Sequence, residues 1–174
     1  MIVENISLLQ CASGIVTRNG RFFENPFNLS SLDIAILQDK KLSDELYNIV
    51  GKIDMPIFTV EHVTYTNPVR FDKIAKFDPY LLKIGLAISS ILRKIKDTGQ
   101  SELFMWMRSH EDYDVICDLD CEEMVNCIAQ NAIILKPVYS FEDLLNGCWD
   151  NDTRFSNLAM VNYLQQRYKH WRAS

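Results

Sequence analysis

The chain has 174 residues, of which 48% are hydrophobic and 24% are charged, and its formal net charge is -5 at pH 7. This composition excludes a disordered, collagen-like or low-complexity protein, and the length allows one hydrophobic core without disulfides or metals. The acidic balance argues against general binding to nucleic acid or to anionic membranes, both of which need a basic surface. The acidic balance is compatible with a basic protein partner.

The location of the protein is predicted from its N-terminus and its cysteines. Residues 1–10 carry no basic segment followed by a long apolar run, so we expect no cleavable signal peptide. The longest apolar run, residues 81–92, contains Lys83 and is shorter than the roughly 20 residues of a membrane helix. An odd number of cysteines indicates free thiols in a reducing compartment. We therefore expect a cytoplasmic protein that does not enter a membrane. The cysteines are Cys11, Cys117, Cys121, Cys127 and Cys148.

The chain is expected to form a single domain over residues 1–174. No segment repeats, and no linker rich in Pro, Gly or Ser divides it. Near the start, residues 15–17 and 21–23 flank Asn19-Gly20. This pattern predicts a small β-hairpin, because both turn residues tolerate positive φ.

The next segments mix helix and strand signals. Residues 30–38 are apolar and fit either a helix or a strand. Ser43 is expected to cap a short helix over residues 44–50, which Gly51 ends. Residues 57–66 are rich in β-branched and aromatic side chains and predict a strand.

A long central helix is predicted between Asp78 and Gly99. Asp78 is a favourable N-cap, Pro79 suits the first helical position, and Gly99 follows the last turn. Apolar residues recur every three or four positions along it and form one continuous stripe. The stripe consists of Leu81, Ile84, Ile88, Ile91 and Ile95.

The second half of the chain predicts more strands and helices. Residues 103–108 and 113–117 read as two strands joined by a short loop. A helix is expected over 121–129 and a strand over 132–136. The predicted core face of this helix consists of Cys121, Met124, Val125 and Ile128. Pro137 makes the strand an edge strand or marks its end.

The chain is expected to end in two helices, one short and one long. Ser140 with Asp143 resembles a capping box opening a short helix that Gly147 closes, and a final helix is expected over 153–171. The strands are expected to pair mostly as hairpins. The predicted fold is α+β, a mostly antiparallel sheet packed by the long central helix and a C-terminal helix.

One segment, residues 111–123, is unusually acidic and contains no Lys or Arg. Such density raises carboxylate pKa values unless a metal, a basic partner or solvent compensates the charge. A local explanation exists for part of it, because Asp120 with Glu123 forms a capping box for the following helix. The acidic residues are Glu111, Asp112, Asp114, Asp118, Asp120, Glu122 and Glu123.

The same segment contains an Asp-x-Asp motif. Residues 115–117 read as the end of an apolar strand, and two carboxylates at Asp118 and Asp120 can share one Mg²⁺ or Mn²⁺. The motif resembles the first motif of haloacid-dehalogenase-type phosphotransferases and the Asp-x-Asp of many glycosyltransferases. In the former family a Gly-Thr pair normally follows, whereas Cys121-Glu122 follows here. The resemblance covers about six residues and implies an alternative function, a small Mg/Mn-dependent phosphoryl- or glycosyl-transfer enzyme.

Two groups of basic residues leave a second alternative, a nucleic-acid-binding regulator, although the acidic balance disfavours nucleic acid. The first group lies along the central helix and its approach, and the second lies near the C-terminus. They are Arg70, Lys73, Lys76, Lys83, Arg93, Lys94 and Lys96, and Arg167, Lys169, His170 and Arg172.

The preferred prediction is a non-enzymatic protein-binding module. It would act as an inhibitor, an immunity-type protein or a regulator that engages a basic protein partner through the acidic segment. Aromatic side chains beside that segment would supply the apolar centre of the interface, and the acidic residues its charged rim. The predicted contact residues are Phe104, Trp106, His110, Glu111, Asp112 and Asp114. No catalytic residue and no cofactor is predicted, and the oligomeric state is left open.

Overall fold

A computed structural model describes residues 1–17, 26–53, 56–62, 79–98 and 115–146. In chain order the elements of these ranges are α1 (Ile2–Thr17), α2 (Ser31–Gln38), α3 (Lys40–Val50), β1 (Phe58–His62), α4 (Pro79–Thr98), α7 (Cys121–Ala129), β2 (Ile133–Pro137) and α8 (Phe141–Leu145). The predicted α+β class is confirmed, with helices predominating over a small antiparallel sheet. The predicted strand 103–108 and the C-terminal helix lie outside the described residues.

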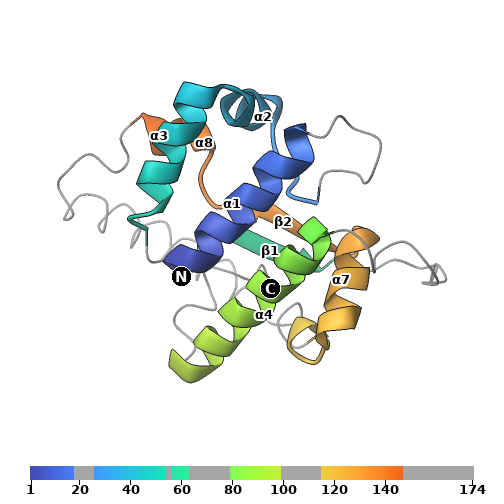
Figure 1. Cartoon of the computed structure of the whole chain (residues 1–174). Helices are drawn as coiled ribbons and strands as arrows, with labels where there is room; N and C mark the ends of the chain where they lie inside the picture. The colour runs from blue at the N-terminus through green and yellow to red at the C-terminus, as the bar shows by residue number, and fades with distance from the viewer. Residues whose placement is uncertain (18–25, 54–55, 63–78, 99–114, 147–174) are drawn as a thin grey trace, which may run out of the picture.

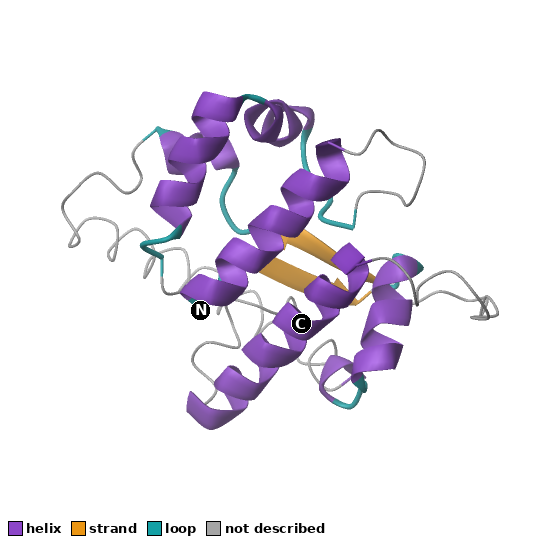
Figure 2. Ribbon diagram, viewed as in Figure 1, coloured by secondary structure: helices purple, strands orange, loops and turns teal. Residues whose placement is uncertain are grey.

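The helices cover the sheet in one main layer (Figure 1). Helices α1 and α4 lie side by side across one face of the two strands, and α7 packs against α4. Helices α2, α3 and α8 form a second group on the side of α1 opposite α4. Figure 2 shows that the strands form a short central ribbon behind α1 and α4.

The two strands are antiparallel and come from distant parts of the chain. Phe58 lies opposite Pro137, and Val138 just beyond β2 donates its N–H to the carbonyl of Ile57 at 2.8 Å. Hydrogen-bonded pairs alternate with non-hydrogen-bonded pairs in such a ladder, so Pro137 occupies a position where no N–H is needed toward β1. The expectation that strands pair mostly as hairpins is wrong for these two, because helices separate them in the chain.

The long central helix is confirmed as α4. It begins at Pro79, and its apolar stripe is buried against the sheet and the neighbouring helices. All five predicted residues are buried, namely Leu81, Ile84, Ile88, Ile91 and Ile95, and Gly85 and Ala87 are buried as well. The proposed cap Asp78 and the stop signal Gly99 lie outside the described residues.

The predicted N-terminal hairpin is wrong. Residues 15–17, expected as its first strand, form the last turn of α1. The helix buries Leu8, Leu9, Cys11 and Ala12 against the rest of the core. Burial of this long stripe outweighs the local turn signal, because most helical stability in proteins comes from packing one face. The other half of the predicted hairpin, 21–23, lies outside the described residues.

The structure decides between helix and strand for residues 30–38, and it shows a different N-cap for α3 from the one predicted. Residues 31–38 are helical, and Ser30 begins α2 with a capping box. Helix α3 begins earlier than predicted, because Asp39 is its N-cap and accepts a hydrogen bond from the N–H of Leu42. Ser43, the predicted cap, is instead buried within the helix. Gly51 ends α3 as expected.

Buried polar side chains join segments that are distant in the chain. Asn5 is fully buried, donates to the carbonyl of Ile53 at 3.0 Å, and accepts from the N–H of Ile57 at 3.2 Å. Asp33 accepts from the Ser30 N–H within its own capping box and from the Phe141 N–H at 2.9 Å. Both side chains satisfy backbone groups that burial would otherwise leave unpaired, which fixes these segments relative to one another.

Glu4 is the charged side chain of α1, and it joins this helix to α4. One carboxylate oxygen accepts from the Ser90 hydroxyl at 2.8 Å, and the Lys94 ammonium lies 2.8 Å from the carboxylate. Burial by itself would raise the pKa of this carboxyl, but the hydrogen bonds from Lys94 and Ser90 outweigh that effect. The pKa of Glu4 therefore falls from its ordinary 4.5 to about 2.

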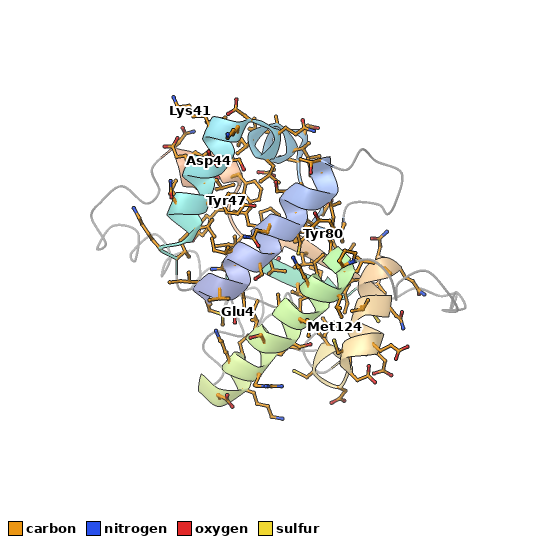
Figure 3. The ribbon with its side chains drawn as sticks, viewed as in Figure 1. Glu4, Lys41, Asp44, Tyr47, Tyr80 and Met124 are labelled. Carbon is orange, nitrogen blue, oxygen red and sulfur yellow. The ribbon has the colours of Figure 1, made fainter. Side chains whose placement is uncertain are left out.

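Two helical glycines allow close contacts between helices. A Cβ at Gly14 of α1 would lie 2.5 Å from ring atoms of Tyr80 in the first turn of α4. A Cβ at Gly85 of α4 would lie 2.8 Å from a methyl carbon of Val125 in α7. Glycine within a helix lowers the stability of that helix. At these two positions it allows the neighbouring helix to pack more closely. Figure 3 shows Tyr80 at the end of α4 that lies beside α1.

Glu4→Gln is expected to lower the free energy of unfolding by about 2 kcal/mol at pH 7, because it removes the buried carboxylate of a partly buried ion pair. A lowered native pKa stabilises the fold above pH 4.5, and this contribution disappears as the pH falls from 4.5 toward 2. Urea unfolding at several pH values measures it. The gap between wild type and variant should close across that pH range; a gap that stays constant contradicts the assignment. Exposed Glu45→Gln on α3 is the control and should change little.

Gly85→Ala is expected to destabilise the protein by about 1–2 kcal/mol, although the same change usually stabilises an exposed helix. The added methyl collides with Val125. In a Val125→Ala background the collision disappears, and Gly85→Ala should become neutral or stabilising. A double-mutant cycle by urea unfolding measures this coupling. Equal effects of Gly85→Ala in both backgrounds would show that the collision is not the cause.

Candidate functional site

The structure describes the acidic segment from residue 115 onward, at the N-terminal end of α7. Residues 115–117 are helical, so the predicted strand over 113–117 is wrong for this part. Ile116 is fully buried, and the N–H of Leu119 donates to its carbonyl at 3.3 Å, which closes a tight turn. The buried Ile116 side chain holds this turn against the core, while Val115 and Cys117 remain exposed.

The capping box predicted for α7 is confirmed. The N–H of Glu123 donates to the Asp120 carboxylate at 2.8 Å, and the N–H of Asp120 donates to the Glu123 carboxylate at 2.9 Å. Two backbone donors that have no partner within the helix are thereby satisfied. Glu122 and Glu123 also lie in the first turn, where the helix dipole favours negative charge. Three of the seven acidic residues of this segment therefore help to begin a helix.

Helix α7 packs against α4 through most of the predicted face. Met124, Val125 and Ile128 are buried, and Val125 contacts the surface that Gly85 leaves open. Cys121, predicted on the same face, is the first residue of α7 and is exposed. Figure 3 shows Met124 beside the α4 ribbon. The apolar face thus attaches the acidic end of α7 firmly to the core.

The acidic side chains of the described part share an exposed end of α7. Asp118, Asp120, Glu122 and Glu123 are all exposed. Asp118 alone among them has no role in the capping box or the first helical turn, and no hydrogen bond or ion pair is found for its side chain within the described residues. This end of α7 therefore presents concentrated negative charge on a segment anchored by Ile116 before it and Met124 after it.

The geometry assumed for an Asp-x-Asp metal site is not observed. Asp118 follows a helical turn rather than a strand, and the Oδ1 of Asp120 already accepts a backbone hydrogen bond. Across residues 1–17, 26–53, 56–62, 79–98 and 115–146, no group of three or more His, Cys, Asp or Glu side chains is arranged to hold a metal ion. The described residues thus give the transferase resemblance no structural support.

The cysteines of the described residues form no disulfide, as predicted, but their surroundings differ. Cys11 is buried, Cys117 and Cys121 are exposed, and Cys127 is half-buried. Burial raises the pKa of the Cys127 thiol, and the nearby Glu123 carboxylate raises that pKa further. A raised thiol pKa disfavours the reactive thiolate. Cys127 therefore acts as a small apolar side chain in the packing of α7.

The basic residues of α4 do not act as one group. Lys94 is engaged by Glu4, whereas Lys83, Arg93 and Lys96 are exposed. The positive charge available on this helix is thus lower than its sequence indicates. The remaining residues of both predicted basic groups lie outside the described residues.

All six predicted contact residues lie outside the described part of the chain. They are Phe104, Trp106, His110, Glu111, Asp112 and Asp114. The structure therefore describes the second half of the acidic segment, residues 115–123, and all six predicted contact residues stay predictions.

Comparisons with known protein families, with curated proteins and with solved structures found no match to the chain. Within the described ranges, no helix combines the length and apolar character needed to cross a membrane. The polar side chains that sequence reasoning missed include Glu4, Asn5 and Asp33. The available signal was their position between apolar residues in α1 and α2, which is typical of buried and paired groups.

Asp120→Ala is expected to lower the free energy of unfolding by about 1 kcal/mol, because it removes the N-cap of α7. Asp118→Ala, two residues away on the same exposed turn, should change stability by less than about 0.5 kcal/mol. Urea unfolding of both variants measures the difference. Equal losses in the two variants would mean that Asp118 also supports the fold.

Proposed function

We propose that this protein is a non-enzymatic protein-binding module, an inhibitor, immunity-type protein or regulator, and that it engages a basic protein partner through the acidic segment 111–123. The observation that carries the proposal is the exposed group of carboxylates at the N-terminal end of α7. Asp118 and Glu122 lie there on a turn that is held to the core.

Anchoring of the described part of the segment, residues 115–123, supports this function on energetic grounds. A flexible acidic loop loses conformational entropy when it binds, which offsets part of the attraction. Here Ile116 and Met124 are fully buried on either side of the acidic turn, so its backbone is already ordered before binding. Clustered charge of one sign accelerates encounter with a partner of opposite charge and suppresses encounters with other acidic proteins.

The distribution of roles within the segment also supports it. Asp120 and Glu123 are explained by the capping box. The Asp118 side chain takes part in no hydrogen bond or ion pair found within the described residues. Its exposed carboxylate is repelled by the neighbouring carboxylates of Asp120 and Glu122. A cationic partner would reduce this repulsion. Binding such a partner would therefore explain the exposed carboxylates that the start of the helix does not require.

The experiment begins with gentle purification of the tagged chain from its native host and identification of a basic protein that leaves at high salt. The association rate of that partner is then measured with purified proteins over a range of salt concentrations. The test variant is Asp118→Asn with Glu122→Gln, which raises the formal net charge from -5 to -3 and leaves the capping box intact. At low salt its association rate should fall by about tenfold.

The matched control is Asp44→Asn with Glu45→Gln on α3. Both residues are exposed, the change in net charge is the same, and α3 lies away from α7 (Figure 1). The control should keep the wild-type association rate within about twofold, since distant surface charges are screened. Equal losses in both variants would indicate an effect of net charge alone. Unchanged rates in both would remove the acidic end of α7 from the interface.

A further inference from the structure

We draw no further inference here: the strongest candidate, the exposed apolar pair that Leu82 and Leu86 form one turn apart on the outward side of α4, is an unpartnered helix face, and nothing in the described part of the chain shows what covers it.

Discussion

The antiparallel contact between α1 and α4 is the constraint on which the described fold depends. At one end Glu4 is held by Ser90 and Lys94, and at the other Gly14 receives the ring of Tyr80. A buried carboxylate without its partners would cost several kcal/mol, so the ion pair selects one register of the two helices. With that register set, the apolar stripe of α4 faces the strands, and its opposite flank is open to α7 at Gly85.

A second set of constraints is made by uncharged or acidic side chains that bind backbone groups. Asn5 holds the chain on both sides of residues 54–55, and so determines where β1 begins relative to α1. Asp33 connects the start of α2 to the start of α8, more than one hundred residues later. Each of these side chains replaces water as the partner of a buried backbone group, and that role confers specificity on an otherwise apolar core.

The acidic end of α7 has a structural role in starting the helix, and in the proposed function the same segment also binds the partner. The capping box uses two of its carboxylates to satisfy backbone donors, which is a local requirement of any helix that begins there. The exposed carboxylates of Asp118 and Glu122 lie beside them on the same anchored turn. In the proposed function, such a surface would lose little conformational entropy on binding, because the fold already orders its backbone.

Local chemistry in the sequence determined the central helix, its buried stripe, the capping box at Asp120 and Glu123, the cap at Ser140 and the strand ending at Pro137. These features depend on residues within a few positions of one another, so a single segment contains the whole signal. Only the tertiary structure decided that residues 15–17 are helical, that 115–117 are not a strand, and that two strands distant in the chain pair together. Those outcomes depend on burial against segments far away in the sequence, and the free energy of that burial exceeds the local preferences that a turn or an apolar run expresses.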